Sequence, residues 1–269
     1  SKKKKSFNLK KKINNKFKLI RIFMNILDIK TLPRSDYIIY AIHSKNNIEN
    51  KKGIINFRNL LKNYPKQTKI LLTSSGSVYG DFSSKKKLKE IQKINYKKLN
   101  SLKGYKKNYR KIKILMEKTF ILLGRKKFNV SIARCFSFIG PRILNKRNYA
   151  ISNFIDQSIN KKSIIVKSQI QSYRSYMYAD DLADWLLNIL ISSNPSCPIY
   201  NVGSDKPYSL YKVASIVSKI FKKPIISNYK KSNLIEYYVP SILKAKNKLG
   251  LSIKYSLKKS INLTAKGLK

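Results

Sequence analysis

Short apolar runs alternate along this chain with segments of helical periodicity, and this alternation limits the possible folds more than any other feature. Residues 36–42, 69–73 and 129–136 are apolar at successive positions, so each run offers apolar side chains to both faces of a strand. The helical segments 50–64 and 105–123 lie between these runs. Strands buried on both faces and separated by helices are typical of a parallel sheet covered on both sides. The sequence therefore predicts a doubly wound α/β fold.

The same reasoning extends over the rest of the chain. Further elements are predicted as strands over 19–23, 163–166 and 198–202, and as helices over 154–159, 180–190 and 209–221. Residues 83–104 are rich in Lys and are expected to form a loop. Gly124 is expected to end the helix over 105–123. No internal repeat interrupts this order.

The charge balance is extreme, with 59 Lys and Arg against 12 Asp and Glu and a formal net charge of +47. A nucleic-acid partner is the usual inference from such an excess. Here the basic residues are mostly Lys and are spread over nearly the whole chain, with abundant Asn and Ile. Compositional drift toward the residues that an AT-rich genome encodes explains this pattern more simply. We expect weak, salt-sensitive attraction to polyanions and no specific nucleic-acid partner.

Cysteine and histidine are scarce, which excludes several classes of site. Cys135 and Cys197 lie far apart, and His43 is the single histidine, so neither a disulfide framework nor a metal site is predicted. This usage fits a reducing cytoplasm. No apolar run reaches the ~18 residues that a membrane-spanning helix needs. The basic start of the chain is not followed by the apolar core of a signal peptide.

Residues 73–80 read TSSGSVYG and directly follow the apolar run 69–73. The segment fits a polar turn, and it also fits a strand end that aims a hydroxyl at a ligand, because doubly wound sheets bind ligands at the carboxyl ends of their strands. A catalytic Ser75 would need a base. His43 is the only histidine and the G-x-S-x-G elbow is absent, so a serine hydrolase is disfavoured and His43 is interpreted as structural.

Tyrosine offers another base, through the Tyr-x-x-x-Lys pattern, which puts both side chains on one helix face. The ammonium is expected to lower the pKa of the phenol, which could then take a proton from a substrate hydroxyl. With 18 Tyr in the chain, about three matches are expected by chance, and three occur. Tyr109 and Lys113 are selected because their helix follows the TSSGSVYG strand and Glu117 continues the same face.

Five motifs in a fixed order resemble the extended short-chain dehydrogenase/reductases, the NAD-dependent nucleotide-sugar epimerases and dehydratases. They are LLTSSGSVYG, the Tyr109–Lys113–Glu117 spacing, ARCFSFIGPR, RSYMYADDLADWL and YNVGS. The resemblance spans roughly residues 19–269 and implies a Rossmann-like sheet with a small C-terminal α/β substrate domain. Residues 1–142, with 173–200 packing back on them, would form an incomplete NAD-binding domain. Residues 143–172 and 201–269 would form the nucleotide-sugar-binding domain.

The resemblance also implies a cofactor site for NAD, with NADP possible. Residues 28–29 are similar to the segment that meets adenine, 40–42 to the strand end under the pyrophosphate, and Phe136 to a residue at the nicotinamide. The cofactor-binding positions carried over in this way are Asp28, Ile29, Tyr40, Ala41, Ile42, Asn50, Thr73, Tyr109, Lys113 and Phe136.

The family roles carried over to the substrate are few. Ser75 would hold and polarise the sugar hydroxyl, Tyr109 would be the base, and Lys113 would tune it and bind the cofactor ribose. Arg174 would bind the substrate's diphosphate, since a guanidinium suits phosphate. Ser137 would contact the sugar, although the family usually has Asn at that position.

The G-x-x-G-x-x-G fingerprint of the family is missing, and the first strand and helix of the family fold have no counterpart. About 30 residues, the size of one βαβ unit, are expected to lie upstream. The fingerprint glycines and the helix behind them cradle the pyrophosphate in this family. Two interpretations stay open, a fragment of a working enzyme and a decayed one.

The reaction is narrowed by two residues. A 4,6-dehydratase resembling this family carries Asp-Glu after its catalytic hydroxyl, where this chain has Gly76 and Ser77. We therefore expect an epimerase or reductase of surface-polysaccharide metabolism. The alternatives are a dTDP-glucose 4,6-dehydratase-like enzyme and a non-catalytic Rossmann remnant that binds nucleotide or polyanion. A homodimer is a family expectation.

Overall fold

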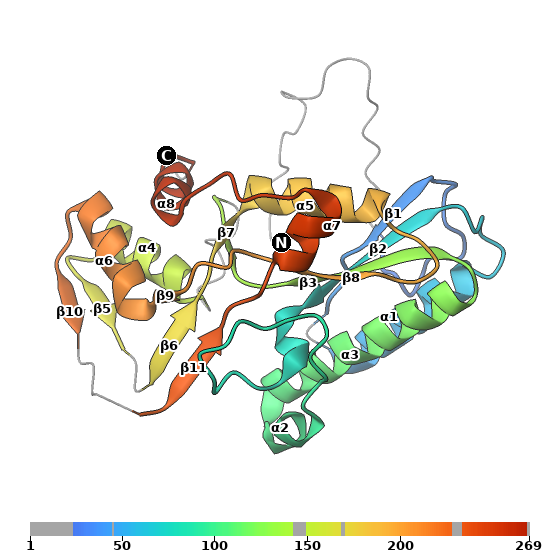
Figure 1. Ribbon diagram of the computed structural model, residues 1–269, viewed down its shortest axis with the longest axis horizontal. Coiled ribbons are helices and arrows are strands. Elements are labelled where there is room, and N and C mark those ends of the chain that lie inside the picture. The colour runs from blue at the N-terminus through green and yellow to red at the C-terminus, as the bar shows by residue number, and fades with distance from the viewer. Residues whose placement is uncertain (1–23, 45, 142–148, 168–169, 228–232, 268–269) are drawn as a thin grey trace, which may run out of the picture.

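The computed structural model describes residues 24–44, 46–141, 149–167, 170–227 and 233–267. A four-stranded parallel sheet forms its centre (Figure 1). The sheet has the order β1 (Tyr37–Tyr40), β2 (Lys69–Ser75), β3 (Asn129–Cys135) and β8 (Ile199–Val202). Every neighbouring pair is parallel, and β2 pairs with β3 over its whole length.

Helices cover both faces of this sheet. The helices α1 (Asn47–Leu60) and α3 (Gly104–Arg125) lie on one face, and α5 (Ala179–Ile191) lies on the other (Figure 1). Buried residues of α1, α3, β1, β2 and β3 form one core cluster, and α5 packs Trp185 and Ile189 against Leu71 and Ala133 on the opposite face. The predicted doubly wound α/β fold is confirmed.

A second group of elements packs beside the carboxyl ends of the sheet strands. It contains α4 (Ala150–Asn160), β5 (Ile164–Val166), β6 (Gln171–Arg174), β9 (Tyr208–Ser209), α6 (Leu210–Phe221), β10 (Ile225–Ser227), β11 (Ile235–Tyr238) and α8 (Leu257–Lys266). The strand β6 lies between β11 and β9, and β5 pairs with β10. A separate core cluster joins α4, α6 and α8. The exact domain boundaries stay a prediction.

Two short elements link these groups. The strands β4 (Phe138–Ile139) and β7 (Met177–Tyr178) pair in parallel, and α7 (Leu243–Leu249) packs near β8. Residues 81–90 also meet the segment after β11, because Leu88 forms a parallel bridge with Pro240 and Tyr237 donates its backbone N–H to Phe82 O at 2.7 Å. Residues close to the sheet and residues near the C-terminus therefore share one surface.

The structure corrects three expectations. The loop predicted over 83–104 contains the helix α2 (Tyr96–Ser101), which the Asn95 side chain caps and which buries Leu99. Gly124 lies inside α3 rather than at its end, because any side chain there would meet Pro195 O at 2.7 Å. The strand β1 is not buried on both faces, since Tyr37 is 54% exposed. The strand predicted over 19–23 lies outside the described residues.

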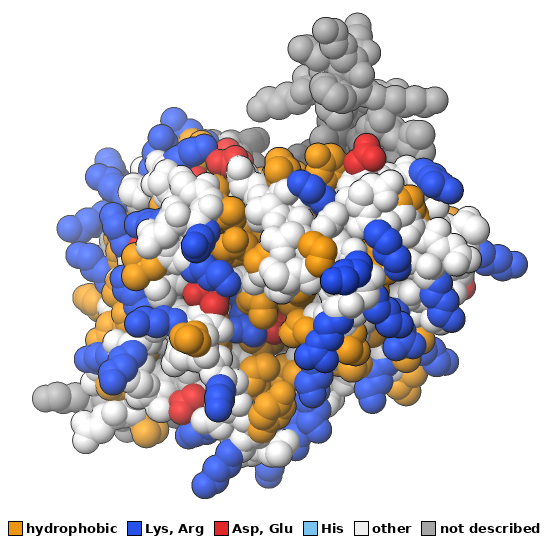
Figure 2. Space-filling model, turned by 45° about the vertical axis from the view of Figure 1, so that its right-hand side comes forward, with side chains coloured by type: hydrophobic (Ala, Val, Ile, Leu, Met, Phe, Trp, Pro, Cys, Tyr) orange, Lys and Arg blue, Asp and Glu red, His pale blue; other side chains and the backbone are white. Residues whose placement is uncertain are grey.

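Basic side chains are distributed widely over the surface. Figure 2 shows Lys and Arg spread across the visible face, interspersed with polar and apolar side chains, rather than gathered in one strip. This distribution agrees with the interpretation of the +47 charge as compositional drift. Among the described residues, no helix has the length and apolar content that crossing a membrane requires.

Candidate active site

The three consecutive hydroxyls at the end of β2 have three different environments. Thr73 Oγ1 donates to Tyr40 O at 3.3 Å on the neighbouring strand. Ser74 Oγ donates to Glu117 Oε1 at 2.6 Å, toward α3. Ser75 Oγ accepts a hydrogen bond from Ser77 N at 3.2 Å and so caps the short 3₁₀ helix η2 (Gly76–Tyr79). The segment is therefore both a turn and a strand end that presents hydroxyls in different directions.

Tyr109 and Lys113 lie on the face of α3 that covers this strand end. The Ser75 hydroxyl is hydrogen-bonded to the Tyr109 hydroxyl. Lys113 Nζ donates to Thr73 O at 2.9 Å and lies 5.9 Å from the centroid of the Tyr109 ring. The four-residue spacing of the helix brings both side chains over the end of β2. Ser75, Tyr109 and Lys113 thus form one cluster.

The pKa of Tyr109 differs from the expectation of a lowered value. Burial raises the pKa of this phenol to about 12, and the hydrogen bond from Ser75 opposes that rise. Burial also lowers the pKa of the Lys113 ammonium, against the influence of Cys135 and Glu117. The reason is that desolvation disfavours the charged form of both groups. In this structure burial outweighs the attraction between ammonium and phenolate.

A buried ion pair that the sequence did not reveal holds the helix over the sheet. Arg134 Nη2 lies 2.8 Å from Glu117 Oε2, and Arg134 Nε donates to Glu117 Oε1 at 3.0 Å. Both side chains are less than a tenth exposed. Because Glu117 lies one turn after Lys113, this pair and the Ser74 hydroxyl fix the part of α3 that carries the candidate site.

Aromatic rings bound the cluster on the side of the C-terminal elements. Phe136 lies so close to Gly76 that a Cβ there would stand 2.5 Å from the ring. Tyr238, at the end of β11, packs on Phe136 with ring centroids 4.6 Å apart. The Tyr238 hydroxyl is also hydrogen-bonded to Ser75. Tyr238 belongs to no motif, so sequence reasoning missed it.

Arg174 reaches the same region from β6. Its Nη2 lies 2.6 Å from Glu236 Oε2, and its guanidinium lies 5.6 Å from the centroid of the Tyr238 ring. The parallel register pairs Arg174 with Tyr238, which places them side by side on neighbouring strands. The predicted diphosphate ligand therefore lies next to the cluster and is paired with a carboxylate. Ser137 is half-buried, and its carbonyl accepts from Met177 N at 3.1 Å.

The remaining cofactor candidates lie around β1. Asn50 Nδ2 donates to Ser44 O at 2.7 Å, and Ser44 N donates to Asn50 Oδ1 at 2.8 Å, so Asn50 fixes the chain after β1. Ala41, Ile42 and Asp28 are exposed, and Ile29 is half-buried.

Two aromatic residues near β1 are placed differently from the expectations. The Tyr40 side chain packs in the core on Phe57, and its buried hydroxyl has no hydrogen-bond partner among the described residues. Only its backbone is near the strand edge. His43 packs perpendicular to the Tyr109 ring at 5.0 Å, so it adjoins the cluster.

The donor set at this edge fits part of a dinucleotide. An ammonium (Lys113), a hydroxyl (Thr73) and exposed backbone at 41–42 are suited to a ribose and a phosphate. No described group of His, Cys, Asp and Glu could hold a metal ion.

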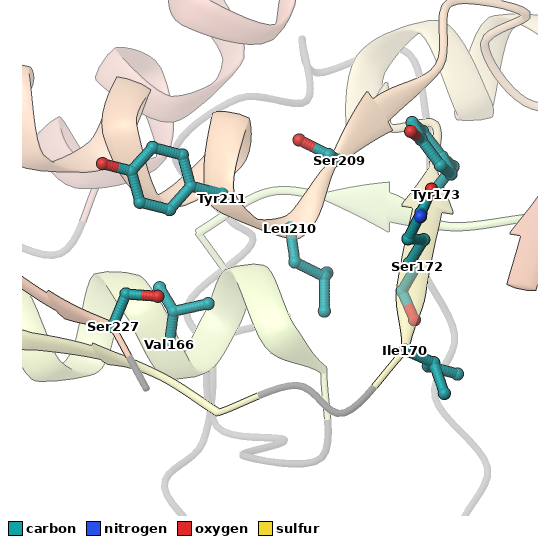
Figure 3. Close-up of a pocket in the computed structure, with 9 residues that line it drawn as sticks. Val166, Ile170, Ser172, Tyr173, Ser209, Leu210, Tyr211 and Ser227 are labelled. Carbon is teal, nitrogen blue, oxygen red and sulfur yellow. The ribbon is translucent and has the colours of Figure 1, made fainter. Parts of the chain in front are cut away.

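A cavity of about 430 Å³ opens among the C-terminal elements. Figure 3 shows Val166 and Ser227 on one side, Ser172 and Ile170 on the other, and Leu210 between them. Tyr173 also lines it, and Arg174 is the next residue along the same strand.

The fold and the Ser–Tyr–Lys cluster define the class, that of the short-chain dehydrogenase/reductases. A sequence model of the NAD dependent epimerase/dehydratase family matches residues 32–203, and the chain belongs to that family.

Curated relatives include UDP-glucuronic acid decarboxylases of Arabidopsis thaliana. The chain is 28% identical to decarboxylase 6 over 269 residues, covering 95% of this chain and 76% of that protein. It is 26% identical to decarboxylase 1 over 214 residues, covering 79% of this chain and 47% of that protein. The chain thus spans about half the length of decarboxylase 1.

Solved structures show the same fold. The dTDP-glucose 4,6-dehydratase of Bacillus anthracis, in complex with NAD, has a TM-score of 0.70 at 15% identity over 86% of this chain and 72% of that one. The UDP-glucuronic acid 4-epimerase of Bacillus cereus has a TM-score of 0.68 at 20% identity over 81% and 67%.

Proposed function

We propose that the protein is an NAD(P)-dependent nucleotide-sugar epimerase or reductase that uses Tyr109, Lys113 and Ser75. The observation that carries the proposal is the hydrogen bond between Ser75 and Tyr109 with Lys113 beside them. Ser75 orients a sugar hydroxyl, and Tyr109 takes its proton. Bound NAD supplies the hydride acceptor, or in the reduced form the donor, at the same carbon. Lys113 stabilises the Tyr109 phenolate and binds the cofactor ribose.

The cofactor-binding role of the other residues is part of this proposal. Lys113, Thr73 and Asn50 lie at the edge formed by β1 and β2, where a dinucleotide binds in doubly wound sheets. Residues 28–29 and 40–42 extend that edge, with Tyr40 contributing its backbone only. Phe136 bounds the cluster opposite α3.

The substrate proposal rests on the elements after β3. Arg174 is suited to the diphosphate, and the neighbouring cavity of about 430 Å³ is of a size that accepts a nucleoside. Ser137 would contact the sugar. The UDP-glucuronic acid decarboxylases among the relatives make UDP-sugars the first substrates to test.

Two further reactions are weighed on single residues. Dehydration at C5 and C6 needs an acid and a base beside the catalytic hydroxyl, and Gly76 and Ser77 supply neither. A dTDP-glucose 4,6-dehydratase-like reaction is therefore the second candidate. Synthesis of sugars for surface polysaccharide, a cytoplasmic location and a homodimer complete the proposal.

A panel of UDP- and dTDP-sugars with NAD and NADP tests the proposal, with product analysis by chromatography and NADH absorbance as readouts. Tyr109→Phe is expected to lower turnover by about 10²-fold or more, the usual contribution of an acid–base group. The matched control is Tyr255→Phe, since Lys259 Nζ lies 4.8 Å from the Tyr255 ring in the same Tyr-x-x-x-Lys spacing. Equal turnover in both variants would remove Tyr109 as the base.

A non-catalytic polyanion-binding protein is the remaining alternative, and the +47 charge is what favours it. Calorimetric titration with NAD and with single-stranded RNA, each at low and high salt, separates the two. The enzyme proposal requires NAD binding that persists at high salt. RNA binding that fades with salt, without NAD binding, would support the alternative.

A further inference from the structure

Tyr238 brings the C-terminal elements into contact with the candidate active site. It is the last residue of β11, and the parallel register with β6 places it opposite Arg174. Its ring packs on Phe136 at 4.6 Å and meets Phe82 nearly perpendicularly at 5.1 Å. The Arg174 guanidinium lies 5.6 Å from the same ring. These contacts hold the ring, so the direction of its hydroxyl is set by the fold.

The hydrogen bonds of Ser75 show what this hydroxyl can do. A serine hydroxyl has one proton to donate and two lone pairs that accept. One lone pair of Ser75 Oγ accepts from Ser77 N at 3.2 Å. Ser75 is also hydrogen-bonded to the hydroxyls of Tyr109 and Tyr238. If Tyr238 donates to the second lone pair, the only proton of Ser75 is left for Tyr109.

We propose that Tyr238 is a positioning residue of the candidate active site, which donates to Ser75 and thereby directs the Ser75 proton toward the oxygen of Tyr109. This inference rests on the proposed function, because it assigns Tyr238 a task in the same proton transfer. Tyr238 acts through Ser75 and needs no contact with the substrate.

The electrostatic surroundings agree with this direction of donation. Burial raises the pKa of the Tyr238 phenol far above its usual value, and the neighbouring Tyr109 raises it further, so Tyr238 keeps its proton. The Ser75 hydrogen bond lowers the pKa of Tyr109, which is what a donated proton does to a phenolate. A protonated Tyr238 on one side of Ser75 and the base on the other form an ordered chain of donors.

The neighbouring strand gives the chain of donors a link to the substrate. Arg174 is the proposed diphosphate ligand, and it lies beside Tyr238 in the β6–β11 pair. A substrate that binds Arg174 would therefore settle next to the residue that orients Ser75. The nucleotide part and the reacting sugar hydroxyl would be aligned by adjacent residues of two paired strands.

The test compares Tyr238→Phe with Tyr237→Phe. Both substitutions remove one phenol hydroxyl from β11 and keep the ring, but Tyr237 faces Tyr173, with centroids 5.7 Å apart. For Tyr238→Phe we expect kcat to fall about fivefold to tenfold, the effect of one lost hydrogen bond, with KM changed less than about twofold. The basic limb of the pH–rate profile should move to higher pH. Tyr237→Phe should keep both the rate and the profile of the wild type.

A second measurement does not depend on turnover. A fluorinated tyrosine placed at position 109 reports its own ionisation by ¹⁹F NMR, and fluorination brings the titration to lower pH. With Tyr238→Phe the midpoint should rise, and with Tyr237→Phe it should not move. An unchanged midpoint and pH–rate profile in Tyr238→Phe would overturn the inference. If the wild type turns over no nucleotide sugar, the proposed function fails, while the ¹⁹F titration still decides the role of Tyr238.

Discussion

Arg134 and Glu117 form a two-point ion pair beneath the candidate active site, with Nη2–Oε2 and Nε–Oε1 distances of 2.8 and 3.0 Å. The pair joins β3 to α3, and Ser74 donates to the same carboxylate. Because Lys113 precedes Glu117 by one turn, the orientation of the Ser–Tyr–Lys cluster depends on this contact.

Glu117→Gln is expected to destabilise the protein strongly. The substitution leaves the Arg134 guanidinium buried without its counter-charge, which costs about 3–5 kcal/mol in comparable cases. Urea unfolding followed by circular dichroism measures the change. The control is Asp184→Asn, which breaks the exposed pair with Lys254 (2.8 Å) and should cost less than about 1 kcal/mol. Similar losses in the two variants would contradict the proposed importance of the buried pair.

Tyr40→Phe is expected to leave stability unchanged or to raise it by up to about 1 kcal/mol, because the buried Tyr40 hydroxyl has no partner among the described residues. The matched variant is Tyr79→Phe. Its hydroxyl donates to the buried Asn201 Oδ1 at 2.8 Å, so its loss should cost about 1–3 kcal/mol. Thermal and urea unfolding of both variants check the difference. A larger loss from Tyr40→Phe than from Tyr79→Phe would show that Tyr40 has an essential partner.

Stability is expected to fall as pH rises from 10 to 12. Burial raises the pKa values of Tyr40 and Tyr109 from 10.0 to about 12, so the folded protein holds these protons more tightly than the unfolded chain. That contribution is complete below pH 10 and is lost as pH rises through 12. Calorimetric melting curves of Tyr40→Phe and Tyr109→Phe should show a smaller alkaline decrease in Tm than the wild type. Tyr37→Phe is the control, since Tyr37 is 54% exposed; an identical decrease in all four proteins would refute this expectation.

Glu236→Gln is expected to strengthen binding of UDP. The Glu236 carboxylate lies 2.6 Å from Arg174 and competes with a phosphate for the guanidinium. Isothermal titration calorimetry with UDP should give a lower Kd for Glu236→Gln and a higher one for Arg174→Met. Asp205→Asn serves as the control, because it removes the same charge from the surface pair with Lys87. If both neutralised carboxylates have equal effects, Arg174 does not meet the phosphate.

Local patterns in the sequence were sufficient to predict the sheet and its helices. The apolar runs at 69–73 and 129–136 became β2 and β3, and the periodic segment at 105–123 became most of α3. The helix α2 was missed because Leu99 is its single buried residue, which gives no periodic signal. The Ser75, Tyr109 and Lys113 cluster was predicted from motif order, and the structure brings these residues together.

Contacts between distant segments were not accessible from the sequence. The pairing of Arg174 with Glu236 and the position of Tyr238 depend on the register of β6 with β11, which no local pattern encodes. The pKa of Tyr109 was predicted in the wrong direction, because the Tyr-x-x-x-Lys spacing reveals the nearby charge but not the depth of burial.

The bridge between Leu88 and Pro240 and the position of Tyr238 beside Ser75 have a consequence for biosynthesis. A ribosome makes the sheet strands β1, β2 and β3 long before β11 leaves the exit tunnel. During that interval the nascent chain already carries Ser75, Tyr109 and Lys113, but the wall formed by Tyr238 does not yet exist. The pocket can be closed only at the end of translation, so a nascent chain that stops before residue 238 would be left with an open, unguarded reaction centre.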